Sequence, residues 1–347
     1  MDMAVEAAMN APMDSGYKVS DSRYVGAEYN RCGRSGLLTS PVTLGLWHNF
    51  GSSDDLDKAR AMVRFAFDKG ITHYDIANNY GSPDGGSAES NFGKILQADF
   101  SDHRDEMVIT TKAGYYMWPG PYGDGGSKKY LVASLDQSLR RLGLDYVDIF
   151  YSHRPDPETP IEETVDALEL AVRSGKALYV GISNYNTEQT RAAFDELHRR
   201  GIRCLVHQTR YSMLDRRPEE GLLDALDELG MGCVAFSPLE QGILTDRYLN
   251  GIPEGSRASG QSVFLTKEQV EARAGVASAL NEIARSRDQT LAQMALAWVL
   301  KRKTVASVII GASSADQIRE NLECTKKGQF TAEELEKIDD IVESFHD

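Results

Sequence analysis

Residues 146–182 have the sequence YVDIFYSHRPDPETPIEETVDALELAVRSGKALYVGI. Two short runs rich in apolar, β-branched and aromatic residues, 146–151 and 177–182, flank a segment of helical character. A strand, a helix and a second strand in this order predict a parallel βαβ unit. This unit indicates the α/β fold class.

The same alternation continues over most of the chain. Strand-like runs separated by helical stretches occupy residues 42–46, 71–75, 107–111, 146–151, 177–182, 204–208, 232–236 and 305–310. Eight parallel strands favour a closed (β/α)8 TIM barrel over an open sheet. Turn signals at residues 32–36 predict an N-terminal β-hairpin within residues 29–38, which we place at the bottom of the barrel. We expect residues 1–28 to be a flexible tail and residues 29–347 to be a single barrel domain.

Two helix starts carry explicit signals. Thr159 offers an N-cap, followed by Pro160 at the first helical position and Glu162 as a capping-box partner. Thr331 and Glu334 form the same pattern ahead of the last predicted helix.

The composition excludes several classes of partner. The chain has 38 Lys and Arg against 52 Asp and Glu, a formal net charge of −14, so nucleic acid and anionic membranes are poor partners. No apolar run reaches the ~18 residues of a membrane span, and the N-terminus lacks the regions of a secretory signal. The four cysteines are widely spaced without a C-x-x-C pair, which favours a reduced, cytoplasmic setting.

Polar side chains follow the strand-like runs, at the barrel end where chemistry is expected. Asp75 ends the second run with Tyr80 shortly after it, Lys112 follows the third run, and His153 follows the fourth. A tyrosine hydroxyl with an ordinary pKa of about 10 becomes a useful acid when a cation such as Lys112 favours its phenolate. Asp75 would hold that cation, and His153 would either orient a carbonyl group or share the proton. Each residue alone is more often a solvated rim group or a packed histidine, and spacing alone does not name the reaction.

Other chemistries lack their motifs. The seven histidines form no H-x-H, H-E-x-x-H or Cys/His ligand spacing, so we expect no metal site. The chain also has no G-x-S-x-G elbow and no G-x-x-x-x-G-K-[ST] phosphate loop. Two connections are long, residues 113–128 and 239–265, and long loops at this end of a barrel are where ligands bind.

Several segments resemble the aldo-keto reductase superfamily. They are Asp75-Ile76-Ala77-Asn78-Asn79-Tyr80, Thr110-Thr111-Lys112, Tyr151-Ser152-His153-Arg154, Gly181-Ile182-Ser183-Asn184, Ser237-Pro238-Leu239 and Gly311-Ala312-Ser313. Within that superfamily the chain resembles the branch that includes bacterial L-glyceraldehyde 3-phosphate reductase and the potassium-channel β subunits, and residues 45–51 and 117–123 resemble the reductase members most. The resemblance implies a (β/α)8 barrel that binds NADPH, with NADH less favoured, and reduces carbonyl groups without a metal. It implies Asp75, Tyr80, Lys112 and His153 as the catalytic set, with Tyr80 as general acid.

The resemblance also implies which residues contact the cofactor. The matching positions are Trp47, Asp75, Ser183, Asn184, Gln208, Phe236, Ser237, Pro238, Leu239, Gln241, Gly242, Leu244, Arg247, Gly311, Ser313, Gln317 and Asn321. Arg247 suits a diphosphate, and a helix starting near Ser314 would direct its N-terminus at a 2′-phosphate. Gln317 has the alternative role of partner to an N-capping Ser314. Leu46, Asp246 and Ser314 depart from the family pattern, and the last two weaken the implied preference for NADPH over NADH.

The expected substrate contacts are Trp47, Tyr80, Trp118, His153 and Arg154. Arg154 is a candidate cation for a phosphorylated aldehyde, or else an ordinary salt-bridge partner. The expected function is NADPH-dependent reduction of small aldehydes, such as L-glyceraldehyde 3-phosphate or methylglyoxal, to alcohols. The alternative is an NADPH-binding, redox-sensing regulatory subunit with slow reductase activity, like the potassium-channel β subunits. The sequence identifies no regulatory partner and leaves the oligomeric state open, a homo-oligomer included.

Overall fold

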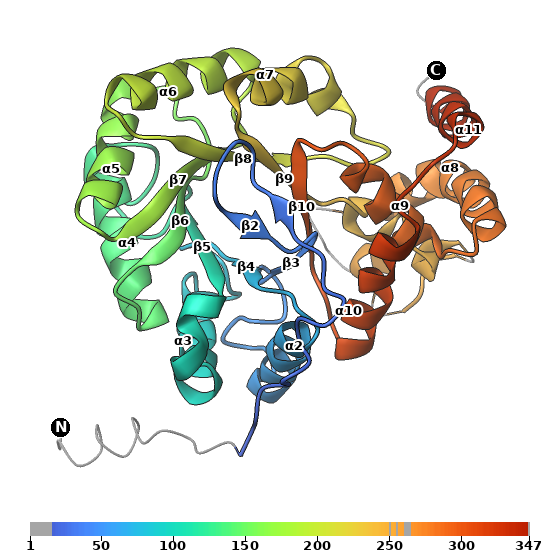
Figure 1. The fold of residues 1–347 in the computed structure, drawn as a ribbon, viewed down its shortest axis with the longest axis horizontal. Coiled ribbons are helices and arrows are strands. Elements are labelled where there is room, and N and C mark those ends of the chain that lie inside the picture. Colours follow the sequence, from blue (N-terminus) through green and yellow to red (C-terminus); the bar gives the residue numbers. More distant parts are fainter. Residues whose placement is uncertain (1–15, 250, 255, 260–264, 346–347) are drawn as a thin grey trace. The chain divides into compact units, whose positions relative to one another are not determined.

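The structure is a computed structural model that describes residues 16–249, 251–254, 256–259 and 265–345. Within these residues, eight parallel strands form a closed barrel in the order β10, β3, β4, β5, β6, β7, β8, β9 (Figure 1). They are β3 (Val42–Gly45), β4 (His73–Asp75), β5 (Val108–Ala113), β6 (Val147–Ser152), β7 (Ala177–Ser183), β8 (Cys204–Arg210), β9 (Gly232–Phe236) and β10 (Val305–Ile310). The predicted (β/α)8 barrel is confirmed, and each predicted run overlaps one barrel strand.

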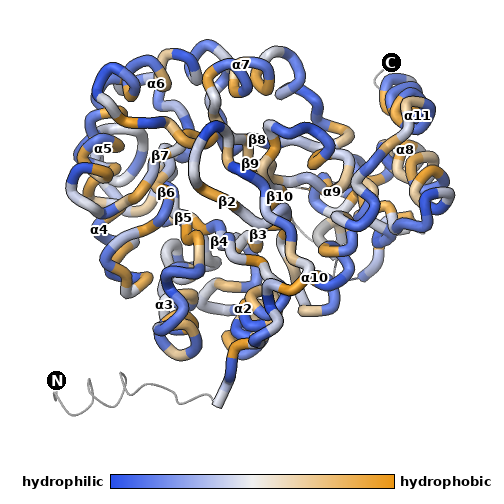
Figure 2. Tube along the Cα trace, in the orientation of Figure 1, coloured by the Kyte–Doolittle hydropathy of each residue, from blue (hydrophilic) through white to orange (hydrophobic). Residues whose placement is uncertain are grey.

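Helices alternate with the strands along the chain, as the βαβ pattern predicts. Among the described residues they are α2 (Leu56–Asp68), α3 (Ser87–Asp99), α4 (Lys128–Leu142), α5 (Ile161–Arg173), α6 (Thr187–Arg199), α7 (Leu222–Leu229), α8 (Lys267–Ser286), α9 (Leu291–Leu300), α10 (Ala315–Leu322) and α11 (Ala332–Glu343). Figure 2 shows hydrophilic and hydrophobic residues alternating along most of these helices, which is the pattern of helices that bury one face.

By internal packing the chain divides into two units, Met1–Ala27 with Leu44–Val180, and Glu28–Thr43 with Gly181–Asp347. In the first unit, β5 and β6 are buried along their whole length and α4 packs against both. In the second unit, β9 pairs with β8 on one side and with β10 on the other. Strands covered on both faces explain the nearly continuous apolar runs of the sequence. The single-domain assignment stays a prediction.

The predicted hairpin is present as the antiparallel pair β1 (Asn30–Arg31) and β2 (Leu38–Thr39). The Arg34 amide donates to the Gly230 carbonyl oxygen (2.9 Å), and the Asn30 side chain donates to the Ala306 carbonyl oxygen (3.0 Å). Gly230 precedes β9 and Ala306 lies at the start of β10. The hairpin therefore lies at the amino-terminal ends of these strands, on the side where it was predicted.

Part of the predicted tail contacts the first unit. Tyr17 Oη donates to Asp68 Oδ1 (2.9 Å) and Arg23 Nε donates to Glu106 Oε2 (3.0 Å). Residues 1–15, the rest of the predicted tail, lie outside the described residues.

One of the two predicted helix starts is wrong. Helix α5 begins at Ile161, its N-cap is Pro160, and no side chain caps it. Thr159 does not cap this helix because its hydroxyl donates to Asp156 Oδ2 (2.7 Å), a local side-chain bond that competes with capping. At α11 the predicted capping box is present, since Thr331 accepts from the Glu334 amide and Glu334 accepts from the Thr331 amide (2.7 Å).

None of the described helices has the length and apolar content that crossing a membrane requires. The four cysteines of the chain are buried free thiols. Burial raises the pKa of Cys32, Cys204 and Cys324 to about 12. Thiols held in this way pack as small apolar groups and are poor nucleophiles.

Two fully buried histidines are expected to make the fold sensitive to acid. Burial lowers the pKa of His73 and of His207 from 6.5 to about 4. The unfolded chain takes up protons on both side chains below about pH 6.5, whereas the folded protein resists protonation until about pH 4. Their stabilisation is therefore present above pH ~6.5 and is lost as the pH falls. Each of the two histidines should lower the free energy of unfolding by on the order of 2 kcal/mol when the pH falls from neutral to ~5.

Urea unfolding near neutral pH and near pH ~5 measures this loss. His207→Gln keeps a donor for the Tyr185 carbonyl oxygen, which lies 3.0 Å from His207 Nε2, but does not titrate. The variant should lose less stability on acidification than the wild type, while His198→Gln, at an exposed position of α6, should behave like the wild type. Equal losses in all three proteins would contradict the assignment to His207.

Candidate active site

Lys112 and Asp75 form a buried ion pair in the first unit. Lys112 Nζ lies 2.7 Å from Asp75 Oδ2 and donates to the Ile76 carbonyl oxygen at 2.7 Å. The other oxygen of Asp75 accepts from Thr110 Oγ1 at 2.9 Å. Thr110 and Lys112 lie two residues apart on β5 and so share a face, while Asp75 is the register partner of Thr110 on β4. Side chains of β5 therefore bond to both oxygens of the Asp75 carboxylate.

Tyr80 lies next to this ion pair, although it is not on a strand. Lys112 Nζ is 4.9 Å from the centre of the Tyr80 ring. The ring centre of Tyr80 lies 6.0 Å from that of His153 and 6.3 Å from that of Trp47. The structure thus brings together the four predicted catalytic residues and Trp47.

The connection from β4 to α3 fixes the backbone of Tyr80. The Tyr80 amide donates to the Ala77 carbonyl oxygen (3.1 Å), and its carbonyl oxygen accepts from the amides of Gly86 (2.9 Å) and Ala88 (3.3 Å). Gly81 and Gly86 have φ values of +103° and +89°, which residues with a Cβ rarely adopt. These glycines let the chain fold back, so that the start of α3 holds Tyr80 in place.

Burial sets the protonation states of the two candidate acids. It raises the pKa of Tyr80 well above 10, and the negative charge of Asp75 acts in the same direction. It lowers the pKa of His153 well below 6.5, and the positive charge of Lys112 adds to this. At neutral pH Tyr80 is therefore a protonated phenol and His153 a neutral imidazole.

Lys112 is subject to opposing effects. Burial lowers the pKa of its ammonium below the ordinary value, and the carboxylates of Asp75 and Glu89 oppose this shift without cancelling it. An ammonium bonded to a carboxylate and a peptide carbonyl oxygen, and lying beside a phenol, can stabilise the phenolate that remains after proton donation. The arrangement is thus suited to protonating an oxygen on which negative charge develops.

Arg154 anchors the loop after β5. Its Nε donates to the Gly114 carbonyl oxygen (2.7 Å) and its Nη2 lies 3.0 Å from Asp124 Oδ1. Its Cζ lies 4.6 Å from the centre of the Tyr115 ring, which in turn meets His153 edge-on at 4.6 Å. Arg154, the cation predicted to bind the substrate, is therefore adjacent to the catalytic set and also bonded to other groups of the protein.

The predicted substrate residue Trp118 lies on the same loop. Its ring packs against Tyr130 of α4, with ring centres 5.1 Å apart. The Tyr130 hydroxyl donates to the Tyr115 carbonyl oxygen and accepts from Asn78 Nδ2 (3.0 Å). These contacts tie the loop to α4 and to the connection that carries Tyr80.

In the second unit, Ser183, Asn184 and Gln208 meet at the ends of β7 and β8. The Asn184 amide donates to the Gln208 carbonyl oxygen (3.1 Å) and its side chain donates to Ser183 Oγ (3.1 Å). Ser183 and Gln208 are buried, while Asn184 is exposed with φ +63°. Hydroxyl and amide side chains gathered in this way match the hydrogen-bonding needs of a carboxamide.

The connection after β9 has an unusual backbone. Ser237, Glu240, Gln241 and Gly242 have φ values of +52°, +47°, +58° and +100°. Such left-handed residues arrange successive N–H groups into concave sites that bind anions. Gln241 Nε2 donates to Ser237 Oγ (3.0 Å), and the buried Glu240 carboxylate lies 2.6 Å from Arg210 Nη2. The predicted residue Phe236 is the last residue of β9, and Pro238, Leu239 and Leu244 lie in the connection that follows it. Arg247 is exposed on the 3-10 turn Asp246–Tyr248 of this connection.

The segment after β10 begins at the exposed Gly311 and leads into α10. Ser314 is the N-cap and accepts from the Gln317 amide (3.2 Å), while Gln317 Oε1 accepts from the Ser313 amide (2.9 Å). The predicted helix start is confirmed. Asn321 is 3% exposed, and its Nδ2 has no hydrogen-bond partner among the described residues. A buried donor without a partner is what a ligand acceptor would satisfy.

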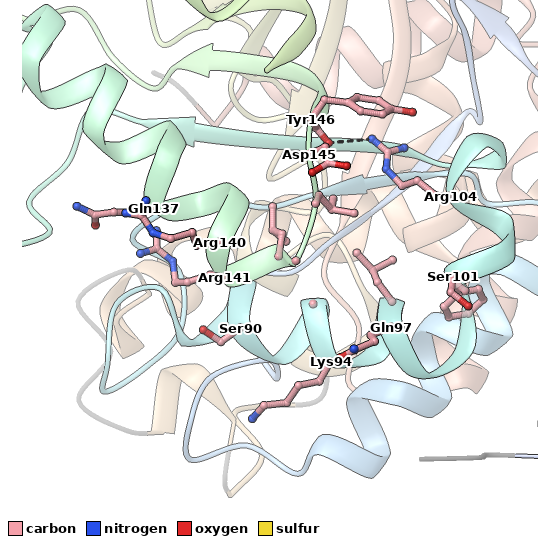
Figure 3. Close-up of a pocket in the computed structure, with 16 residues that line it drawn as sticks. Ser90, Lys94, Gln97, Ser101, Arg104, Gln137, Arg140, Arg141, Asp145 and Tyr146 are labelled. Atoms are coloured by element: carbon pink, nitrogen blue, oxygen red, sulfur yellow. Dashed lines mark hydrogen bonds between the residues drawn. The ribbon is translucent and has the colours of Figure 1, made fainter. Parts of the chain in front are cut away.

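A groove of about 810 Å³ lies elsewhere, between α3 and α4 (Figure 3). None of the predicted site residues lines it. Its side chains Arg104 and Arg141 are bonded internally, with Arg104 Nη2 2.8 Å from Asp148 Oδ2 and Arg141 Nε 2.7 Å from Glu89 Oε2. The groove is therefore not a candidate for the carbonyl chemistry.

Sequence reasoning did not assign Thr110, Tyr115 or Glu89 to the site. Thr110 could have been found, because residues two apart on a strand share a face and Lys112 was already assigned. The contact of Tyr115 with His153 and the contacts of Glu89 depend on how loops and helices pack, which spacing does not reveal.

Comparisons with known proteins show which family the sequence matches. A family model described as "Aldo/keto reductase family" matches residues 41–343. An L-glyceraldehyde 3-phosphate reductase of Escherichia coli O157:H7 is 55% identical over 322 residues, which cover 91% of this chain and 93% of that protein. The protein of the same name from Escherichia coli K12 is 54% identical, with the same coverage. A probable voltage-gated potassium channel subunit beta of Oryza sativa subsp. japonica is 34% identical over 323 residues, covering 91% and 97%.

Proposed function

Because this chain belongs to the aldo/keto reductase family and is therefore an oxidoreductase, we propose that it reduces small aldehydes to alcohols with NADPH, using Tyr80 as general acid. The observation that supports this most directly is the buried Lys112–Asp75 pair, with Lys112 Nζ 4.9 Å from the Tyr80 ring centre. Such a pair places a positive charge beside a phenol whose ring lies close to the rings of His153 and Trp47.

Tyr80 is a better candidate than His153 for the acid. A histidine whose pKa lies well below 6.5 is neutral at physiological pH and lacks the proton of an imidazolium. Tyr80 keeps its proton until charge develops on the substrate oxygen, and the Lys112 ammonium then stabilises the phenolate. His153 would donate a hydrogen bond that orients the carbonyl oxygen. In the reverse direction the same groups remove the proton of an alcohol.

The residues of the second unit fit a nicotinamide dinucleotide. Ser183, Asn184 and Gln208 would hold the carboxamide, and the left-handed loop that follows β9 would hold the diphosphate. The Nδ2 of Asn321, which has no hydrogen-bond partner in the described part of the chain, and the N-terminus of α10 would contact the adenosine 2′-phosphate end. When bound, the nicotinamide supplies the hydride that adds to the carbonyl carbon.

A short phosphorylated aldehyde is the proposed substrate class. L-glyceraldehyde 3-phosphate is the substrate named for the relatives that are 54% and 55% identical. Arg154 supplies a cation next to the catalytic set, since the Tyr115 ring contacts both Arg154 and His153. A guanidinium can bind a phosphate with two hydrogen bonds.

Replacing Arg154 with glutamine should therefore discriminate between substrates. Hydrogen bonds to charged groups contribute about 1.5–3 kcal/mol, so KM for L-glyceraldehyde 3-phosphate should rise about 10- to 100-fold. KM for an uncharged aldehyde should change much less. Asp124→Asn is the matched control, because it weakens the same loop anchor but leaves the cation. An equal rise for both aldehydes in Arg154→Gln would contradict the phosphate role.

The proposed function is tested by the loss of NADPH absorbance with L-glyceraldehyde 3-phosphate, methylglyoxal and an aromatic aldehyde, and with NADH in place of NADPH. Rapid turnover that depends on Tyr80 would support the proposal, and equal efficiency with NADH would overturn the cofactor preference. Slow turnover of every aldehyde together with tight NADPH binding would instead favour a redox-sensing regulatory subunit. That alternative is supported by the 34% identity to a potassium channel subunit beta.

A further inference from the structure

Glu89 is a buried carboxylate behind the candidate active site. Its side chain is 0% exposed. Oε1 accepts from Thr111 Oγ1 at 2.6 Å, and Oε2 lies 2.7 Å from Arg141 Nε. Glu89 is in the first turn of α3, Thr111 is on β5 and Arg141 is near the end of α4. A single carboxylate thus joins three elements of the first unit.

Two of these elements, α3 and β5, position residues of the catalytic set. Thr111 directly precedes Lys112, and because neighbouring residues on a strand point to opposite faces, Glu89 holds β5 from the side opposite the ammonium. The first turn of α3 holds the Tyr80 carbonyl oxygen through the Gly86 and Ala88 amides. The Glu89 side chain therefore connects the segment that carries Tyr80 to the strand that carries Lys112.

This connection matters because the segment between Tyr80 and α3 is rich in glycine. Three of the six residues at positions 81–86 are glycines, and two of them adopt left-handed conformations. A charge-assisted bond from a buried carboxylate is stronger than a neutral hydrogen bond, and leaving one partner unpaired is costly. Arg141 also lines the groove, where its guanidinium donates to Glu89 Oε2 (2.7 Å) and to Ser138 Oγ (3.4 Å) (Figure 3).

We propose that Glu89 is a positioning residue of the reductase site, which fixes α3 against β5 and α4 and thereby sets the placement of the Tyr80 hydroxyl relative to Lys112. The inference rests on the proposed function. A displacement of about 1 Å in a reacting group can lower a rate by about 100-fold. Loss of the carboxylate should therefore lower kcat, while the cofactor residues of the second unit are untouched.

The test measures kcat, KM, the NADPH dissociation constant by fluorescence and the urea midpoint for four variants. Glu89→Gln keeps an acceptor for Thr111 but loses the charge that faces Arg141. Thr111→Val removes the donor on β5, and Thr111→Ser restores it. Arg140→Met is the control, because Arg140 is the neighbour of Arg141 on α4 and lines the same groove (Figure 3).

We expect Glu89→Gln and Thr111→Val to lower kcat about 10- to 100-fold, with KM and NADPH affinity close to wild type. Thr111→Ser and Arg140→Met should keep wild-type kcat. A folded Glu89→Gln variant with wild-type kcat would overturn the proposal. A decrease in kcat that is matched by equal decreases in NADPH binding and in the folded fraction would also overturn it, because it would reflect unfolding. If Glu89→Gln fails to fold, the comparison of kcat between Thr111→Val and Thr111→Ser tests the proposal. No turnover by the wild type overturns the proposed function itself, and the positioning role with it.

Discussion

Replacing Tyr80 with phenylalanine is expected to lower kcat for every aldehyde by about 10²–10⁴-fold, the usual contribution of a general acid. The substitution removes one hydroxyl and keeps the ring that packs against Trp47 and His153. Cofactor binding should remain near wild type, because the proposed carboxamide and diphosphate contacts come from other residues. The measurements are the loss of NADPH absorbance at saturating aldehyde and a fluorescence titration with NADPH.

Tyr115→Phe is the matched control for this variant. Tyr115 also lies against His153, with ring centres 4.6 Å apart, but its ring has Arg154 rather than Lys112 as its cation neighbour. Loss of that hydroxyl should change kcat little. Wild-type turnover by Tyr80→Phe would show that another group donates the proton.

The second large effect is expected from Lys112→Met. Both partners of the Lys112–Asp75 pair are buried, with exposed side-chain fractions of 0% and 3%. Removal of the ammonium leaves the Asp75 carboxylate buried without its counter-ion, which should lower the free energy of unfolding by about 3–5 kcal/mol. The phenolate of Tyr80 also loses its fixed positive charge, so kcat should fall by about 10²–10³-fold. Urea unfolding and steady-state kinetics measure the two effects separately.

The double variant Asp75→Asn with Lys112→Met separates stability from catalysis. With both charges gone, no ion is left unpaired, and part of the lost stability should return. Turnover should not return, because the cation is still missing. Additive losses of stability from the two single substitutions would mean that the ion pair is not their common cause.

The fold was predictable because its determinants are local. Strands β9 and β10 have the bounds that the apolar runs predict, and the other barrel strands differ by only a few residues at their ends. Parallel strands covered on both faces leave an uninterrupted apolar signal. The placement of Asp75, Lys112 and His153 at one end of the strands follows from the direction of the chain, so their grouping could also be predicted.

The remaining features depend on tertiary contacts. Thr159 has the sequence signal of an N-cap, but its hydroxyl donates a hydrogen bond to Asp156. Only the folded loop reveals this contact. Glu89 is an acidic residue in the first turn of a helix, a position where exposed carboxylates are common for electrostatic reasons. Its burial against Thr111 and Arg141 arises from the packing of α3 and α4, and no spacing in the sequence encodes it.

The left-handed loop after β9 has a cost in stability. Each of Ser237, Glu240 and Gln241 adopts a conformation that is unfavourable by about 1–2 kcal/mol for an L-residue. These residues adopt the left-handed conformations when the chain folds, so the strain lowers the stability of the folded protein. A preformed loop binds an anion without first becoming ordered. Under the function proposed above, substitutions that relax these residues should raise the thermal stability of the protein and weaken its binding of the diphosphate. Thermal stability and affinity would then make opposing demands on the same few residues.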